Sequence, residues 1–277
     1  MSSSQSPHGR RILAGLIRIE AILVIIAAIY IAIIALAFSF LRILPGEINY
    51  TMIIQGIGCA VLSIPLIALA YHAFMKASVR TRYVIAFLIT LLIGAVWTSL
   101  ICNLVPYDDQ LVIATAAKTI SQGKAFQGGI GERTQLYMEQ YPYQSTFALY
   151  MALLSRLFGA YPFTVARAIN VIIMSISVLI VGRISYVMFR SRRAEAATLL
   201  LCILFIPISM FSYKVYGNIL VLPFMLTALF MALHVMNKDE KHRIRTLTLL
   251  ALSSLMSIAI KPNSMIVIIA MVITLVM

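Results

Sequence analysis

No charged side chain occurs in residues 84–107, which read VIAFLITLLIGAVWTSLICNLVPY. A helix rises about 1.5 Å per residue, so about 20 residues of this kind cross the hydrocarbon core of a bilayer. Charged residues are also absent from residues 21–41, 196–213 and 262–277. Because backbone groups in hydrocarbon have to be satisfied within their own segment, these runs predict membrane-spanning helices. The period-2 pattern of a membrane barrel is not seen.

The composition indicates the same class of protein. Of the 277 residues, 62% are apolar and 11% are charged, whereas a soluble domain carries about 25% charged residues. The net charge of +13 comes from short basic clusters between apolar runs, which is typical of membrane topology and not of a nucleic-acid partner. Cys59, Cys102 and Cys202 lie singly in apolar runs without metal-binding spacing. The predicted fold class is therefore all-α, a polytopic transmembrane helical bundle.

Several segments qualify as spans, and one is ambiguous. The six full-length candidates are residues 20–42, 51–75, 83–105, 162–189, 196–212 and 217–236. Two shorter apolar segments, 246–260 and 263–277, are separated by Lys261-Pro262. Residues 143–158 would reach about 24 Å as a helix, which is short for a crossing.

The distribution of basic residues decides how residues 143–158 are interpreted. If this segment does not cross, 14 of the 22 basic residues face the cytoplasm; if it crosses, about ten do. If residues 143–158 do not cross, the cytoplasmic basic residues are Arg10, Arg11, Arg18, Lys76, Arg80, Arg82, Arg183, Arg190, Arg192, Arg193, Lys238, Lys241, Arg243 and Arg245. We therefore expect a multi-pass protein of the cell membrane with a cytoplasmic N-terminus, an interfacial or re-entrant helix at 143–158 and a long external loop at 106–161.

The external loop begins with an acidic pair, Asp108 and Asp109, directly after a predicted span. Either carboxylate is expected to cap the helix that follows, where it complements the helix dipole. Either is also suited to remove a proton from an incoming hydroxyl at the membrane surface. Both roles can hold together, one residue capping while its neighbour acts. Glu132 and Glu139 are the other acids of this loop, and each is compatible with simple solvation.

Four motifs in order resemble the GT-C superfamily of membrane glycosyltransferases, near the protein O-mannosyltransferase and aminoarabinose transferase group. The motifs are PYDDQ at 106–110, YPYQSTFALYMALLSRLFGAYPFTVARAIN at 141–170, the span that begins VARAIN at 165–170, and IKPN at 260–263. The resemblance covers residues 83–277. It divides the chain into an N-terminal tail with two spans, 1–82, and a GT-C-like core that we expect to be C-terminally incomplete, because Met277 lies inside an apolar run.

The resemblance implies an inverting transfer of a hexose or pentose from a polyprenyl-phosphate donor to an acceptor at the outer face. It makes Asp109 the general base and Asp108 a supporting acid or cap. A phosphate leaving group needs fixed cations, for which Lys261 and, less strongly, Arg167 are the candidates. Tyr141 and Gln144 are candidates for the sugar pocket. The implied partners are membrane lipids, the lipid-linked sugar donor and an unknown acceptor, with no cofactor and no support for a divalent metal.

Alternatives remain at the sequence level. Lys261 could simply extend to the interface, and Tyr141 could belong to an aromatic belt. Relatives often carry His where this chain has Tyr143, and an acid where it reads Val215-Tyr216-Gly217-Asn218. A non-catalytic relative or assembly partner of the same fold is therefore the second hypothesis. A transporter is the third and is less favoured because there is no inverted repeat; Asn170 is interpreted as an interhelical hydrogen-bonding residue.

Overall fold

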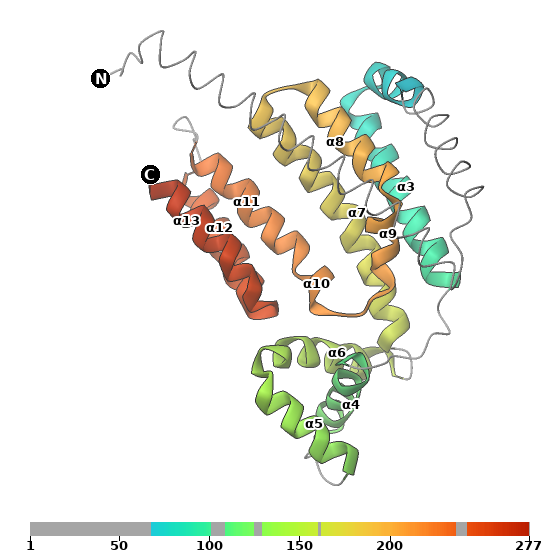
Figure 1. The fold of residues 1–277 in the computed structure, drawn as a ribbon, viewed down its shortest axis with the longest axis vertical. Coiled ribbons are helices and arrows are strands. Elements are labelled where there is room, and N and C mark those ends of the chain that lie inside the picture. Colours follow the sequence, from blue (N-terminus) through green and yellow to red (C-terminus); the bar gives the residue numbers. More distant parts are fainter. Residues whose placement is uncertain (1–67, 101–108, 125–128, 160–161, 237–242, 277) are drawn as a thin grey trace, which may run out of the picture. The chain divides into compact units, whose positions relative to one another are not determined.

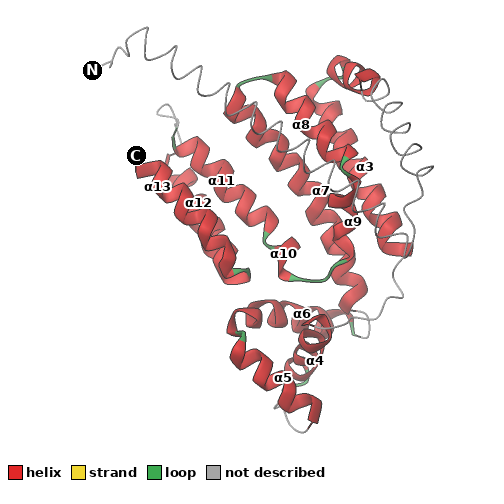
Figure 2. Cartoon of the chain, viewed as in Figure 1, coloured by secondary structure: helices red, strands yellow, loops and turns green. Residues whose placement is uncertain are grey.

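The computed structural model describes residues 68–100, 109–124, 129–159, 162–236 and 243–276. The predicted spans at 20–42 and most of 51–75 lie outside these residues, and so does Asp108. Every regular element in the described part of the chain is a helix, which confirms the all-α prediction for those residues (Figure 2).

Four described helices are long and apolar enough to cross a membrane, with mean hydropathy between 1.4 and 2.2. They are α3 (Val79–Leu100), α7 (Pro162–Phe189), α10 with α11 (Gly217–Leu220 and Leu222–Val235), and α12 (Arg243–Ile260). Helix α7 has the bounds that the sequence predicted, and α12 begins three residues earlier than expected. The short apolar helix α13 (Met265–Val276) follows the 3₁₀ turn η3 (Pro262–Ser264). Length and composition of these helices indicate a membrane protein.

The predicted span at 196–212 differs from a straight helix. It consists of α8 (Arg192–Leu204), α9 (Ile206–Met210) and the 3₁₀ turn η2 (Phe211–Tyr213), and its two parts are bent by 56°. Pro207 near the start of α9 explains the break, because proline has no N–H and its ring clashes with the preceding turn of a helix. This segment is therefore either a broken span or a re-entrant loop.

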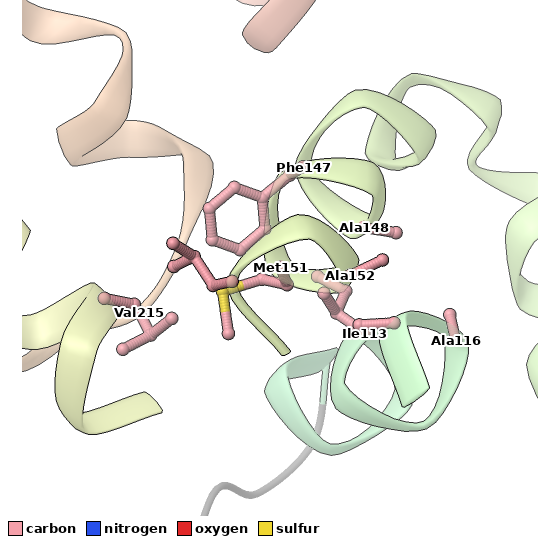
Figure 3. Packing of buried hydrophobic residues seen from close by; sticks show 10 residues of the cluster. Ile113, Ala116, Phe147, Ala148, Met151, Ala152 and Val215 are labelled. Atoms are coloured by element: carbon pink, nitrogen blue, oxygen red, sulfur yellow. The ribbon is translucent and has the colours of Figure 1, made fainter. Parts of the chain in front are cut away.

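Residues of the predicted external loop form a separate layer of short helices, α4 (Asp109–Ser121), α5 (Gly129–Gln140), the 3₁₀ turn η1 (Pro142–Gln144) and α6 (Ser145–Phe158). Figure 1 shows this layer at one end of α7. Its core contains Ile113 and Ala116 of α4 with Phe147 and Met151 of α6, and Val215 contacts the same cluster (Figure 3). The segment after η2 is therefore seated on this layer.

Helix α6 has the properties of an interfacial helix. Its 14 residues span about 21 Å, and it ends at Gly159, whose φ of 62° few other residues adopt. One face packs on α4, while Leu149, Leu153 and Leu157, spaced four residues apart, are more than half exposed. This stripe is suited to the apolar part of a membrane surface while the opposite face packs on the loop helices, and the interfacial position of residues 143–158 stays a prediction.

The basic clusters around residues 82 and 192 meet at the opposite end of α7 from the α4–α6 layer (Figure 1). Arg82 donates to the carbonyl of Arg192 at 3.5 Å, and Tyr83 donates to Glu195 at 2.7 Å. The structure thus separates the arginine-rich ends of α3, α7 and α8 from the acidic entrance of the loop, which agrees with the sequence-based distribution.

A crossing by α7 predicts that residues before and after it are accessible from opposite sides of the membrane. In a chain without its native cysteines, Glu139→Cys and Arg193→Cys should react with a membrane-impermeant maleimide from opposite sides, because both positions are exposed. Labelling of sealed cells, before and after permeabilisation, checks this. Labelling of both positions from one side would show that α7 does not cross.

Candidate functional site

Polar side chains from five separate segments meet beside the α4–α6 layer. We name them the Tyr216 cluster: Asp109, Tyr137, Gln144, Tyr216 and Lys261. Asp109 begins α4, Tyr137 lies on α5, and Gln144 ends η1. Tyr216 precedes α10, and Lys261 connects α12 to η3. The cluster therefore joins the loop helices to the ends of two apolar helices.

The hydroxyl of Tyr216 connects the loop helices. It accepts a hydrogen bond from Nε2 of Gln144, whose side chain is buried, and it donates to Oδ2 of Asp109 at 3.4 Å. A donor–acceptor distance of 3.4 Å is long for an O–H···O bond, so this contact with Asp109 is weak. Because Asp109 is exposed, its carboxylate keeps acceptor capacity for a further ligand.

The ammonium group of Lys261 lies over the face of the Tyr216 ring. The ammonium nitrogen of Lys261 lies 4.9 Å from the ring centroid, within the range of a cation–π contact. Burial lowers the pKa of Lys261, and the positive charge of Lys214 lowers it further. Among the residues that the structure describes, neither lysine forms an ion pair with a carboxylate. Two neighbouring ammonium groups at a partly buried position favour the binding of an anion.

Tyrosine side chains border the acidic side of the cluster. Burial raises the pKa of Tyr137, and a hydrogen bond to Asp109 adds to this increase. The Tyr137 ring lies 4.8 Å from the ring of Tyr141, which in turn lies 6.0 Å from that of Tyr143. Burial also raises the pKa of Tyr216, the charge of Asp109 acts in the same direction, and the Gln144 hydrogen bond opposes it. Both phenols that face Asp109 thus remain protonated donors at neutral pH.

Two contacts hold the segment that carries Tyr216. Nδ2 of Asn170, buried in α7, donates to the carbonyls of Ser212 and Lys214 at 3.2 Å each, which confirms the predicted interhelical role of Asn170. A Cβ added at Gly217 would lie 3.4 Å from the carbonyl oxygen of Ile260, an ordinary van der Waals distance, so the start of α10 lies close to the end of α12. This approach brings Tyr216 to Lys261.

The structure brings together Asp109, Gln144 and Lys261 of the residues selected from the sequence. Tyr141 borders the same site through its ring contact with Tyr137. Arg167 is buried on α7, one turn before Asn170 and therefore on the same side of that helix. Asp109 also lies in the first turn of α4, where its charge complements the helix dipole, so the predicted capping and chemical roles remain compatible.

Sequence reasoning missed the central residue. Tyr216 lies in the Val215–Asn218 segment, and a single tyrosine near the start of an apolar helix gave no reason to select it. Tyr137 and Lys214 were also missed, because their contribution depends on neighbours far away in the sequence. Within the described part of the chain, no group of three or more His, Cys, Asp or Glu side chains is arranged to hold a metal ion.

No protein-family model, curated protein or solved structure matches this chain.

The interaction between Asp109 and Tyr137 predicts a measurable change in titration. A phenolate beside a carboxylate is disfavoured, so removing the carboxylate charge with Asp109→Asn should lower the pKa of Tyr137 towards its ordinary value, while burial keeps part of the increase. Spectra of isotope-labelled tyrosine as a function of pH check this, with the Tyr137 signal assigned through Tyr137→Phe.

Glu139→Gln is the matched control, because Glu139 is exposed and bonds to Gln135 on the same helix. This variant should leave the Tyr137 titration unchanged. An identical titration in the wild type and in Asp109→Asn would show that the two groups do not interact.

Proposed function

We propose that this chain is a polytopic membrane glycosyltransferase that moves a sugar from a polyprenyl-phosphate donor to an acceptor at the outer face of the membrane. The observation that carries the proposal is the position of Tyr216 between a candidate base and a candidate phosphate-binding cation. The hydroxyl of Tyr216 contacts Asp109, and its ring forms a cation–π contact with Lys261. These two residues are 152 positions apart in the numbering, and the reaction requires both types of group at one site.

In the proposed reaction, Asp109 on one side of Tyr216 accepts a proton and Lys261 on the other side stabilises the leaving phosphate. Asp109 takes the proton from the acceptor hydroxyl as its oxygen attacks the anomeric carbon of the donor. The bond between that carbon and the phosphate oxygen breaks, and the charge that develops on the leaving phosphate is stabilised by Lys261 with Lys214 nearby. A direct salt bridge would neutralise both groups, so the intervening tyrosine keeps the base and the cation available.

The orientation that the basic residues predict supports an external site. With residues 143–158 at the interface, 14 of the 22 basic residues face the cytoplasm, the N-terminus included, and the Tyr216 cluster faces outward. The exposed leucines of α6 support a position of the loop layer at the membrane surface, where a donor lipid would approach from within the leaflet. Gln144 and Tyr141 then border the region that receives the sugar, and Arg167 lies deeper along α7.

The alternative is a non-catalytic membrane protein of the same architecture. It is favoured by the long contact between Tyr216 and Asp109 and by the place of Asp109 in the first turn of α4, which suffices for a structural role. In that case Asp109 would contribute only to the stability of α4. A transporter is less favoured for the reasons given by the sequence.

Replacing the proposed base should distinguish a glycosyltransferase from a non-catalytic membrane protein. Asp109→Asn keeps the size of the side chain and its contact with Tyr216 but removes the proton acceptor, so transfer should fall about 10²- to 10⁴-fold while membrane insertion is retained. Sugar transfer from a radiolabelled polyprenyl-phosphate donor in proteoliposomes measures this. Glu139→Gln makes the same chemical change at an exposed position of α5 and should retain activity.

Wild-type transfer by Asp109→Asn would remove Asp109 from the mechanism. Absence of transfer by the folded wild-type protein with every donor tested would favour the non-catalytic alternative.

Replacing the proposed cation should affect use of the donor. Lys261→Ala should raise KM for the lipid-phosphate donor about tenfold, because a charge-assisted hydrogen bond to phosphate is lost. Lys261→Arg should restore most of the affinity, since it keeps the charge beside the Tyr216 ring. Steady-state kinetics at varied donor concentration separate KM from kcat. An unchanged KM in Lys261→Ala would reject a phosphate-binding role.

A further inference from the structure

A second charged cluster lies at the other end of α7, and the proposed sugar transfer does not use it. It consists of Tyr83 on α3, Arg183 and Tyr186 on α7, and Arg192 and Glu195 on α8, and we name it the Glu195 cluster. Glu195 is fully buried at its centre. It accepts hydrogen bonds from the Tyr83 hydroxyl at 2.7 Å and from Nη1 of Arg192 at 2.9 Å.

The cluster has more positive than negative charge. Two guanidinium groups approach the single carboxylate, and that of Arg183 is the more distant, with Nη1 3.8 Å from Oε1 of Glu195. At this distance Arg183 is attracted by the charge of Glu195 without a well-formed hydrogen bond. The side chains of Arg183 and Arg192 are 50% and 46% exposed, so N–H groups on both face the surroundings.

Aromatic rings hold both guanidinium groups in place. The central carbon of the Arg183 guanidinium lies 4.7 Å from the ring centroid of Tyr83, and that of Arg192 lies 4.0 Å from the centroid of Tyr186. An arginine that is stacked and paired in this way loses less conformational entropy when it binds a ligand. Planar donors fixed side by side suit the oxygen atoms of a phosphate group.

The surroundings of the cluster determine which phosphate it would meet. The cluster lies where α3 begins, α7 ends and α8 begins, which is the level of lipid headgroups if α3 and α7 cross the membrane. Arg190 and Arg193 are exposed nearby and add positive charge. Arg82 is different: it is buried and donates to the carbonyls of Phe74 and Met75, so it has a structural role.

An apolar stripe runs from Arg183 towards the middle of α7. Ile176 and Ile172 lie 7 and 11 residues before Arg183, on the same face of the helix, and are 40% and 46% exposed. These residues are about 10 and 16 Å from Arg183 along the helix axis. A soluble phosphate compound has no apolar group that could bury this surface. The acyl chain of a lipid, which lies below the headgroup, would cover it and remove it from water.

We propose that the Glu195 cluster binds the phosphodiester headgroup of an anionic phospholipid, with Arg183 and Arg192 as donors and the Ile172–Ile176 stripe against the acyl chain. Glu195 acts as the positioning residue that holds both arginines. The proposal requires that α3 and α7 span the membrane, and it is independent of sugar transfer.

Arg183→Gln is the sharpest test. It removes one donor and its charge but leaves the bonds of Glu195 with Arg192 and Tyr83 in place. Binding of phosphatidylglycerol to the full chain in detergent, measured by native mass spectrometry, should be about tenfold weaker in this variant. Arg183→Lys keeps the charge but loses the planar donor pair, so its affinity should lie between those of the wild type and Arg183→Gln.

Arg245→Gln is the matched control, because Arg245 is an exposed arginine on α12 whose removal changes the net charge equally. It should bind phosphatidylglycerol as the wild type does. Phosphatidylcholine with the same acyl chains should bind weakly to all variants. Soluble glycerophosphoglycerol should also bind weakly, because it lacks acyl chains.

Wild-type binding of phosphatidylglycerol by Arg183→Gln would overturn the proposal. An equal loss in Arg245→Gln would do the same, because net charge would then explain the binding. Strong binding of glycerophosphoglycerol would contradict a lipid site and indicate a site for soluble phosphodiesters. If Arg183→Gln does not fold, Arg183→Lys provides the test, and unchanged affinity in that variant would contradict the donor role. Loss or retention of sugar transfer in Asp109→Asn leaves this result unaffected.

Discussion

Hydrocarbon offers no hydrogen-bonding partner to a peptide group, and this constraint determines where chemistry can occur in the chain. Backbone groups are satisfied within helices, and the long apolar helices carry few charges along their length. Charged and aromatic side chains therefore gather where helices end. One end of α7 has the Tyr216 cluster, the other has the Glu195 cluster, and each joins segments that are far apart in the sequence.

The two clusters use tyrosine in different ways. In the Glu195 cluster, the hydroxyl of Tyr83 donates to the carboxylate while its ring contacts the guanidinium of Arg183. Tyr83 therefore holds the buried carboxylate and the guanidinium close together. Tyr216 keeps Asp109 and Lys261 on different sides of one side chain, which leaves both accessible to ligands. Paired charges around Glu195 fix the geometry between α3, α7 and α8, whereas the separation of charges by a neutral phenol is suited to a reaction that needs both charges.

Much of the fold could be predicted from the sequence, because length and absence of charge translate directly into spans. The bounds of α7 follow from these two properties, and the distribution of basic residues predicted that Asp109 and Lys261 lie on one side, where both contact Tyr216. The interfacial position of α6 stays a prediction. The bend at Pro207 was missed because the apolar run continues through it. Tyr216 and Glu195 were missed for another reason: each depends on at least one partner more than 70 residues away, Gln144 for Tyr216 and Tyr83 for Glu195, which periodicity and charge counting cannot reveal.

The central claim is that the Tyr216 cluster receives a lipid phosphate at the end of α7 that carries the α4–α6 layer. Photocrosslinking with a diazirine-bearing polyprenyl phosphate tests it without knowledge of the sugar or the acceptor. The account predicts labelled peptides containing Tyr137–Gln144 and Tyr216 or Lys261, with labelling reduced by unlabelled polyprenyl phosphate and by Lys261→Ala. Labelling confined to the α7–α8 junction around Arg192, or labelling insensitive to both competitor and substitution, would contradict it.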